Sequence, residues 1–378
     1  MQKEINEKLK QIKQSSLYRR LPHEAQGEEL FTPATNDYLG LARDQRVKKA
    51  AQEAIAIYGT GSTGSRLTTG NNVLHERLEK ELASFKGYEA CLLYSSGYLA
   101  NIGVITAMAD KQTVIFSDQY NHASLIDGCR LSKARIVIYK HNDMNDLERK
   151  LIRFEQTNKK IILTDGVFSM DGDVAPLDQL DYLAKRYHSL LVVDDAHGTG
   201  VLGESGRGST EYFGLQPDIL IGTLSKAFGS EGGFVCAKET FVDYFIQRSR
   251  PFIFQTALSP ANVAAALMSL HIIQTEKRHQ ALKKQASKLR KTLGDLYTIP
   301  ETACITPIVP LIIGSNEAAL QLQTQLYKYG IHIPAIRPPT VPEGMSRLRC
   351  TLSSNYPEEK IDYLIHTLTI LAKDAERS

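Results

Sequence analysis

Two apolar runs of the chain end in side chains capable of covalent and acid–base chemistry. Lys226 follows D-I-L-I-G-T, and Asp194 ends S-L-L-V-V-D, with His197 three residues later. A lysine amine can form an imine with an aldehyde, and a carboxylate can keep a heterocyclic nitrogen protonated. Because ligands of open α/β sheets bind beyond the carboxyl ends of the strands, these side chains are well placed to act together.

This set of groups matches the needs of pyridoxal phosphate (PLP). The cofactor requires an amine for its aldehyde, an anion opposite its ring nitrogen and donors around its phosphate. Lys226 and Asp194 supply the first two, and His197 can donate to the phenolic oxygen. Alone, a lysine after a strand is commonly a solvated surface residue, and an aspartate there is commonly a turn residue or a helix cap. Their combination predicts a PLP site with Lys226 as the Schiff-base lysine.

A candidate phosphate site begins at Ser96-Gly97-Tyr98, where a helix is expected directly after E-A-C-L-L-Y. The first N–H groups of a helix point outward and bind phosphate well. A serine that only caps the helix is an equally good interpretation of this motif alone. His122 also follows an apolar run and either stacks on a planar ring or simply begins a helix.

Two other ligand classes fit the sequence less well. Asp194, Asp195 and His197 resemble part of a metal site, but no second histidine lies at H-E-x-x-H or similar spacing. G-T-G-S-T-G from Gly59 matches G-x-G-x-x-G, but it follows a helical run and lacks an acid at a strand end ~20 residues later. We therefore expect neither a metal nor a dinucleotide. The motif from Gly59 could still form a glycine-rich loop of the active site.

The elements that must position these residues are indicated by short, β-branched apolar runs, which are typical of strands buried on both faces. Helix signals lie between several runs, such as Asp143 before M-N-D-L-E-R-K-L-I-R-F and Pro176 before L-D-Q-L-D-Y-L-A-K-R-Y. This alternation predicts an α/β fold with a large, doubly wound, mostly parallel sheet. The expected strands are E-A-C-L-L-Y, T-V-I-F-S, R-I-V-I-Y, K-I-I-L-T-D, S-L-L-V-V-D, D-I-L-I-G-T and G-G-F-V-C-A.

The character of the sequence changes after about residue 255. Helical segments such as A-N-V-A-A-A-L-M-S-L-H-I-I are followed by strand-like I-V-P-L-I-I and R-L-R-C-T-L and a closing helix. A chain of 378 residues also exceeds the usual size of one core. We therefore expect an N-terminal segment (1–45), a PLP-binding α/β domain (46–255) and a smaller C-terminal α+β domain (256–378).

Composition and charge disfavour several partners. A net charge of +3 with evenly spread acids does not predict nucleic-acid or anionic-membrane binding. The charged start M-Q-K-E-I-N-E-K-L-K lacks the apolar core of a signal peptide, and no later run approaches the ~20 apolar residues of a membrane span. The five scattered cysteines form no C-x-x-C pair and read as buried thiols of a reducing compartment. We expect a cytoplasmic protein.

Taken together, the motifs resemble those of the α-oxoamine synthase family, within the fold type I PLP-dependent transferases. The resemblance spans nearly the whole chain in the family's order. Two departures are mild: D-D-A-H replaces the commoner D-E-A-H, and Tyr98 replaces a phenylalanine. The matching strings are N-D-Y-L-G-L from Asn36, G-S-T-G-S-R-L-T-T-G to Gly70, S-S-G-Y-L-A-N from Ser95, N-H-A-S from Asn121, G-V-F-S-M-D-G-D from Gly166, D-D-A-H-G from Asp194, T-L-S-K-A-F-G-S-E-G-G from Thr223 and R-L-R-C-T-L-S from Arg347.

The resemblance implies a role for each matching residue. Arg349 would grip the amino-acid carboxylate through a bidentate pair, although nearby Arg347 leaves that choice open. Arg20 is the suggested contact for the distal carboxylate of the acyl donor, and Asn36 joins the substrate-binding set. The implied catalytic residues are Lys226, His122, Asp194 and His197. The implied cofactor-binding residues are Ser96, Gly97, Tyr98, His122, Ser169, Asp194, His197, Thr223, Lys226 and Thr256, the last reaching a neighbouring subunit's phosphate in a homodimer.

The implied reaction is a decarboxylative condensation of an amino acid with an acyl thioester. S-R-L-T-T-G is most similar to the biotin-pathway member, which joins L-alanine to a pimeloyl thioester carried by coenzyme A or by a carrier protein. In the implied mechanism Lys226 removes the Cα proton, Asp194 keeps the ring nitrogen protonated, and His122 donates to the thioester oxyanion. Two alternatives stay open: another member such as glycine C-acetyltransferase, and a catalytically idle interaction protein that retains the fold.

Overall fold

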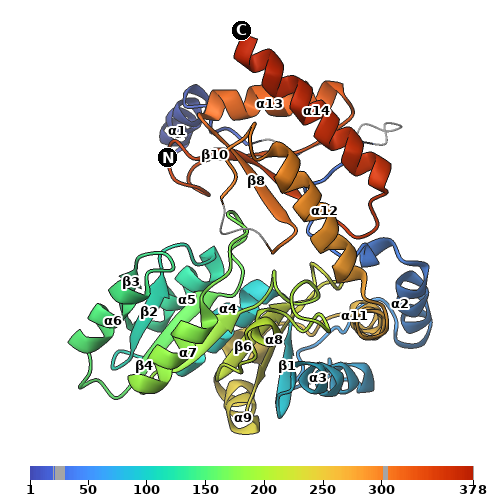
Figure 1. Ribbon diagram of the computed structural model, residues 1–378. Helices are drawn as coiled ribbons and strands as arrows, with labels where there is room; N and C mark the ends of the chain where they lie inside the picture. The colour runs from blue at the N-terminus through green and yellow to red at the C-terminus, as the bar shows by residue number, and fades with distance from the viewer. Residues whose placement is uncertain (20, 22–29, 301–304, 378) are drawn as a thin grey trace. The chain divides into compact units, whose positions relative to one another are not determined.

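The computed structural model describes residues 1–19, 21, 30–300 and 305–377 (Figure 1). The chain divides into two compact units, which are described separately. The larger unit comprises Asn36–Ser169 and Asp173–Ala281. The smaller unit comprises Met1–Thr35, Met170–Gly172 and Leu282–Ser378.

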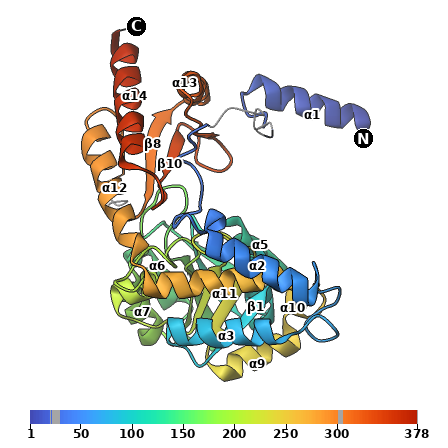
Figure 2. The same cartoon turned by 90° about the vertical axis from the view of Figure 1, so that its right-hand side faces the viewer.

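The unit boundaries differ from the expected domain boundaries. The N-terminal segment 1–45 is divided at residue 35, and the boundary expected at 255/256 lies at 281/282. The second difference has a packing cause, because α11 (Pro260–Thr275) lies alongside α2 (Gln45–Tyr58) in the larger unit (Figure 2). Ten residues of α11 are buried, so this helix belongs to the core of the larger unit although it follows the last strand of its sheet.

The larger unit is built on a seven-stranded sheet with the order β1-β7-β6-β5-β4-β2-β3. β7 runs antiparallel to β1 and β6, and the other neighbours are parallel. All seven expected strands form, and the mostly parallel sheet confirms the predicted α/β architecture. The strands are β1 (Ala90–Tyr94), β2 (Val114–Asp118), β3 (Arg135–Tyr139), β4 (Lys160–Asp165), β5 (Leu190–Asp194), β6 (Ile219–Thr223) and β7 (Gly233–Ala237).

Several helices of the larger unit, among them α3, α4, α6, α7 and α9, pack on this sheet (Figure 1). One face of the sheet forms an apolar cluster in which Ile115, Leu163 and Val192 pack with Val104 of α4 and Phe245 of α9. Asp143 caps α6 as expected, accepting a hydrogen bond from the Asp146 N–H at 2.8 Å. Besides α2 and α11, the helices of this unit are the 3-10 turn η1 (Leu41–Arg43), α3 (Val73–Lys86), α4 (Gly97–Met108), α5 (Ala123–Ser132), α6 (Met144–Arg153), α7 (Leu177–Arg186), α8 (Ser209–Phe213), α9 (Glu239–Arg248) and α10 (Arg250–Ile253).

The smaller unit contains a three-stranded antiparallel sheet with the order β8-β10-β9. The expected strands I-V-P-L-I-I and R-L-R-C-T-L form β8 and β10, and the expected helix closes the chain. The strands are β8 (Ile308–Gly314), β9 (Ala335–Ile336) and β10 (Ser346–Thr351). The helices are α1 (Gln2–Gln14), α12 (Arg278–Leu293), which begins in the larger unit, α13 (Asn316–Lys328) and α14 (Glu358–Arg377).

Two sequence expectations concern the chain as a whole. Cys91, Cys129, Cys236 and Cys350 are buried free thiols, as expected, while Cys304 lies outside the described residues. Within the described ranges, no helix combines the length and the apolarity needed to cross a bilayer.

Candidate active site

The carboxyl ends of β5 and β6 bring the four expected catalytic residues together in the larger unit. Asp194 ends β5, Lys226 follows β6, and Lys226 Nζ lies 2.9 Å from His197 Nε2. The His122 side chain is solvent-accessible, yet surrounding protein desolvates its ring and lowers its pKa; the charge of Asp194 opposes this shift and that of Lys226 adds to it. Both charges therefore act on the His122 ring.

A hydrogen-bonded chain fixes the Asp194 carboxylate. Asn101 Nδ2 donates to Asp194 Oδ2 at 2.6 Å and to Ser124 Oγ at 2.8 Å, and Ser124 Oγ lies 2.7 Å from His122 Nδ1. The Ala196 N–H donates to Asp194 Oδ1 at 2.9 Å, so both carboxylate oxygens are oriented. Sequence reasoning missed Asn101 and Ser124, because both lie within helices rather than at strand ends, although each belongs to a recognised motif.

Tyr38 completes the surroundings of His197. Its hydroxyl lies 2.6 Å from His197 Nδ1, and the tyrosine side chain is fully buried. Both ring nitrogens of His197 are thus engaged, one with Tyr38 and the other with Lys226. The Tyr38 hydroxyl also donates to Asn36 Oδ1 at 3.5 Å, which places Asn36 beside this group. Tyr38 was not singled out from the sequence, although N-D-Y-L-G-L contains it.

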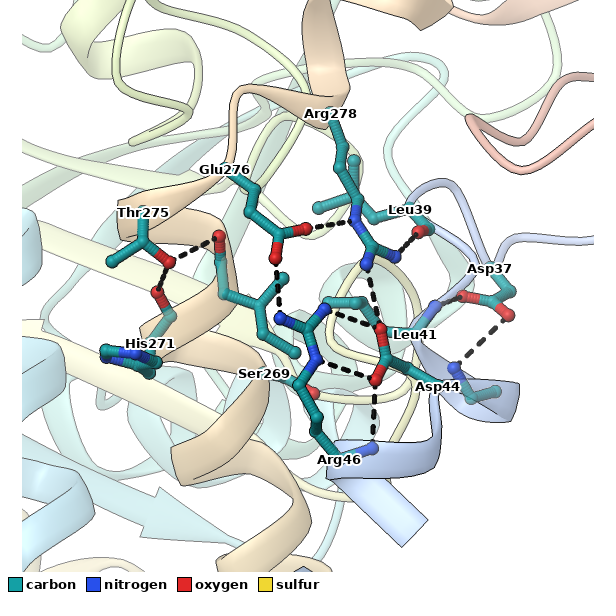
Figure 3. Close-up of polar contacts among 12 residues, drawn as sticks. Asp37, Leu39, Leu41, Asp44, Arg46, Ser269, His271, Thr275, Glu276 and Arg278 are labelled. Atoms are coloured by element: carbon teal, nitrogen blue, oxygen red, sulfur yellow. Dashed lines mark hydrogen bonds and ion pairs between the residues drawn. The ribbon is translucent and has the colours of Figure 1, made fainter.

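A charged network holds the segment that carries Tyr38 (Figure 3). Arg278 donates to the Leu39 carbonyl at 3.0 Å and pairs with Asp44 and Glu276, each at 2.8 Å. Arg46 bridges the same two carboxylates, and its hydrogen bond holds the pKa of Asp44 well below its usual range. The turn before α2 is therefore tied to the start of α12, which fixes the backbone beside Tyr38.

The start of α4 and the end of β6 form a cradle of donors. Ser96 caps α4 by accepting the Leu99 N–H at 3.1 Å, and the first N–H groups of the helix, at Gly97 and Tyr98, have no intrahelical acceptor. A Cβ at Gly97 would lie 3.1 Å from Thr223 Cβ, so a side chain there would crowd this space. The Thr223 hydroxyl lies 2.7 Å from Ser225 Oγ. In this structure the Thr223 hydroxyl donates to the Gly232 carbonyl at 2.9 Å, and the amides at the start of α4 suit a phosphate group.

The remaining expected site residues are more dispersed. Ser169 is half-buried in the loop after β4, and Thr256 is exposed, with its carbonyl accepting from Ser95 Oγ at 3.0 Å. Arg349 belongs to β10 of the smaller unit. Arg20 lies outside the described residues.

Arg347 is occupied within the smaller unit. Its guanidinium pairs with Asp171 Oδ1 at 2.6 Å and donates to the Met170 carbonyl at 3.1 Å, and the residue is 1% exposed. A fully buried guanidinium with these partners is suited to holding structure. The expectation that Arg349 binds the amino-acid carboxylate stays a prediction.

The two adjacent aspartates of D-D-A-H have separate surroundings. Asp195 Oδ2 lies 3.1 Å from Lys86 Nζ, and both side chains are fully buried. Asp195 Oδ1 accepts the Ser209 hydroxyl at 2.6 Å, and the Lys86 ammonium also donates to Thr199 Oγ1 at 2.7 Å. Asp195 thus neutralises a buried lysine, while Asp194 bonds to Asn101. Among the residues that the structure describes, no group of three or more histidine, cysteine or acidic side chains is arranged to hold a metal ion.

A second charged cluster lies near these strand ends and was also missed. His141 Nδ1 is 2.9 Å from Asp118 Oδ1, and His141 Nε2 is 2.7 Å from Asp173 Oδ2. A ring nitrogen must carry a proton to donate to a carboxylate, so this geometry requires a doubly protonated imidazolium. Burial alone would lower the pKa of His141, but the hydrogen bonds and charges of Asp118 and Asp173 outweigh it and raise the pKa to about 9.

This cluster should make the stability of the protein depend on pH between about pH 6.5 and about pH 9. A histidine pKa raised by folding contributes stability that is complete below the unfolded pKa of about 6.5 and is lost as pH rises through the folded pKa. For His141 that loss should approach about 3 kcal/mol and be spread between about pH 6.5 and about pH 9, the unfolded and folded pKa values. Urea unfolding at a series of pH values would measure it. If the free energy of unfolding of His141→Gln fell as steeply with pH as that of the wild type, the raised pKa of His141 would not be its cause.

Comparisons with known proteins identify the family of the chain. The family model for aminotransferase class I and II matches residues 32–368. The 8-amino-7-oxononanoate synthase 2 of Bacillus subtilis (strain 168) is 50% identical, with 98% of this chain and 97% of that protein covered. The structure of 8-amino-7-oxononanoate synthase from Francisella tularensis has a TM-score of 0.80 at 29% identity, covering 92% of this chain and 98% of that chain. A variant of serine palmitoyltransferase from S. paucimobilis with bound PLP–myriocin aldimine has a TM-score of 0.92 at 29% identity, covering 98% of this chain and 97% of that chain.

These relatives confirm the resemblance to the α-oxoamine synthases and the fold type I architecture. Enzymes of the matched family depend on PLP. The match covers most of the chain, including every strand of the seven-stranded sheet. The chain therefore belongs to the aminotransferase class I and II family.

Proposed function

We propose that the chain is a PLP-dependent 8-amino-7-oxononanoate synthase. It condenses L-alanine with a pimeloyl thioester, releasing carbon dioxide and the carrier thiol. The observation that carries the proposal is the meeting of Lys226, His197 and Asp194 at neighbouring strand ends, with Lys226 Nζ 2.9 Å from His197 Nε2. The name of the Bacillus subtilis relative at 50% identity supports the choice of substrates.

The residues present fit the cofactor. Lys226 would hold it covalently through Nζ, and the Gly97 and Tyr98 amides with the Thr223 hydroxyl would bind its phosphate. Asn101 and the Ala196 amide hold the Asp194 carboxylate ready to face a protonated ring nitrogen. When bound, PLP supplies an electron sink for cleavage of bonds at the amino-acid Cα.

Two side chains would handle protons. Lys226 Nζ would accept the Cα proton of alanine and later return a proton to the product, with His197 Nε2 adjacent to steer it. His122 Nδ1 accepts the Ser124 N–H at 3.3 Å, so the proton of the neutral ring lies on Nε2. Its lowered pKa keeps this ring neutral near pH 7. His122 Nε2 is therefore suited to donate to the developing thioester oxyanion.

The amino-acid carboxylate would be bound by Arg349. Arg347 is the nearest alternative, but Asp171 and the Met170 carbonyl engage its guanidinium. A bidentate guanidinium–carboxylate pair also explains why an arginine is used. Asn36, which accepts from the Tyr38 hydroxyl, would contribute to the substrate pocket.

The choice of substrates is tested by a panel. The purified protein is mixed with alanine, glycine or serine and with pimeloyl or acetyl thioesters on coenzyme A, and pimeloyl-carrier protein is included. Mass spectrometry should detect 8-amino-7-oxononanoate, and kcat/KM for alanine with a pimeloyl donor should exceed that for glycine with acetyl-CoA by at least about a hundredfold. The opposite preference would indicate a glycine C-acetyltransferase.

We also propose that the enzyme works as a cytoplasmic homodimer. Leu67, Val73 and Phe254 are more than half exposed in the single chain, and Thr256 is exposed on the segment that follows Phe254. A second copy covering these apolar side chains would bring Thr256 to its neighbour's phosphate site. Light scattering would measure the mass, and a monomer that retains full activity would exclude this arrangement. Buried free thiols favour a reducing compartment.

A further inference from the structure

We propose that His141 is a positioning residue that joins the two loop segments carrying His122 and Ser169. The inference rests on the proposed function, because the resemblance to the α-oxoamine synthases implies that both residues bind the cofactor. The joined segments follow β2 and β4 in the larger unit, and His141 lies just beyond β3. His141 itself contacts neither Lys226 nor Asp194 among the described hydrogen bonds, so it acts through other residues.

The first segment is held by Asp118. Its Oδ1 accepts the Tyr120 N–H at 2.8 Å and faces His141 Nδ1 at 2.9 Å, and Oδ2 accepts the Asn142 N–H at 3.0 Å. The Tyr120 ring stacks on His141 with a centroid distance of 4.5 Å and an interplanar angle of 27°. His122 follows two residues after Tyr120, so these contacts fix the backbone that leads to His122.

The second segment is held by Asp173. Asp173 Oδ2 faces His141 Nε2 at 2.7 Å and accepts from Asn142 Nδ2 at 2.8 Å. The Asp173 carbonyl accepts the Phe168 N–H at 2.9 Å, and a bridge joins Val167 to Val174, which closes this loop on itself. The Phe168 ring meets His141 edge-on at 4.4 Å. Ser169 is the next residue, so its position depends on the same contact.

Charge explains why a histidine is required at this position. The Asp118 and Asp173 side chains are 0% and 4% exposed, and His141 is the cation between them. The other groups that face His141 are the neutral side chains of Asn142, Tyr120 and Phe168. A neutral residue would leave two buried carboxylates facing each other, and their repulsion would separate the segments.

The test compares charge-altered variants reconstituted with PLP. His141→Gln removes the cation, and His141→Gln with Asp173→Asn restores the original net charge. His366→Gln, on an exposed face of α14, is the matched control. The readouts are PLP affinity by equilibrium dialysis, the pH titration of the visible absorption band, and kcat and KM.

We expect His141→Gln to weaken PLP binding about tenfold and to lower kcat/KM by about tenfold to a hundredfold, since small misplacement of reacting groups is costly. The double variant should recover most of both losses, and His366→Gln should behave as wild type. Unchanged affinity and spectrum in His141→Gln, or a double variant as impaired as the single one, would overturn the proposal. If wild type binds PLP and turns over in these experiments, such a result refutes the role of His141 and leaves the proposed function intact.

Asp173→Asn alone keeps the inference testable if His141→Gln does not fold. Removing one carboxylate should let His141 lose its proton at a lower pH than about 9. PLP affinity should then decline at lower pH in Asp173→Asn than in wild type. Coincident pH profiles for the two proteins would count against the proposal.

Discussion

Replacing Lys226 with alanine should lower turnover by at least about a thousandfold and abolish covalent attachment of PLP. Under the proposed mechanism one amine performs both tasks, and the neighbouring His197 cannot form the imine. The purified variant should lack the yellow species that borohydride reduces onto the wild-type chain. Absorption spectra, mass spectra after reduction, and turnover with alanine and pimeloyl-CoA would be measured on the same samples.

A matched control is available in Lys238. Like Lys226 it follows a strand, but it is exposed and lies after the antiparallel strand β7. Lys238→Ala should therefore keep full colour and activity. A Lys226→Ala protein that still turns over at a substantial rate would refute the assignment.

Replacing Asp194 with asparagine should separate cofactor attachment from proton abstraction. Lys226 remains, so the covalent link should form. An amide cannot hold a proton on the ring nitrogen, and its Nδ2 would also face one of the two donors that now bond to Asp194, Asn101 Nδ2 or the Ala196 N–H. We expect the alanine Cα proton to exchange with deuterium oxide about a hundredfold to a thousandfold more slowly. NMR would measure the rate of this exchange.

Asp195→Asn is the control for this experiment. It removes the counter-ion of the fully buried Lys86, so it should lower the free energy of unfolding by about 3–5 kcal/mol. Exchange of the Cα proton per folded molecule should stay close to wild type. If the two variants lost exchange equally, the distinct roles of Asp194 and Asp195 would be refuted.

The residues at strand ends could be predicted because their signal is local. A short apolar run, the sign of a buried strand, leads directly to Asp194 and Lys226, and parallel strands bring their ends to one edge. Seven strands, the mostly parallel sheet and the smaller unit's strands followed from the same patterns. The position of β7 between β1 and β6 could not be predicted from the sequence, because the pairing of β7 with β1 joins segments distant in sequence.

The residues that were missed act through tertiary contacts. Asn101 lies inside α4, where a polar residue is ordinarily a surface residue, and only packing brings it to Asp194. Tyr38 precedes its partner His197 by 159 positions. His141 belongs to no motif singled out from the sequence. Its role follows from the fold, which places it between the carboxylates of Asp118 and Asp173. The boundary between the compact units at 281/282 differs from the domain boundary expected at 255/256, because α11 reads from its sequence as a helix of either unit.

The buried Lys86 also constrains how β5 can align during folding. Asp195 directly follows β5, so a slip of one position toward its N-terminus would put Ala196 where Asp195 now lies and Asp195 where Asp194 lies. With Ala196 in that place the buried Lys86 ammonium would have no counter-ion, at a cost of about 3–5 kcal/mol. The ion pair between Lys86 and Asp195 therefore favours the strand alignment that also places Asp194 at the carboxyl edge of the sheet.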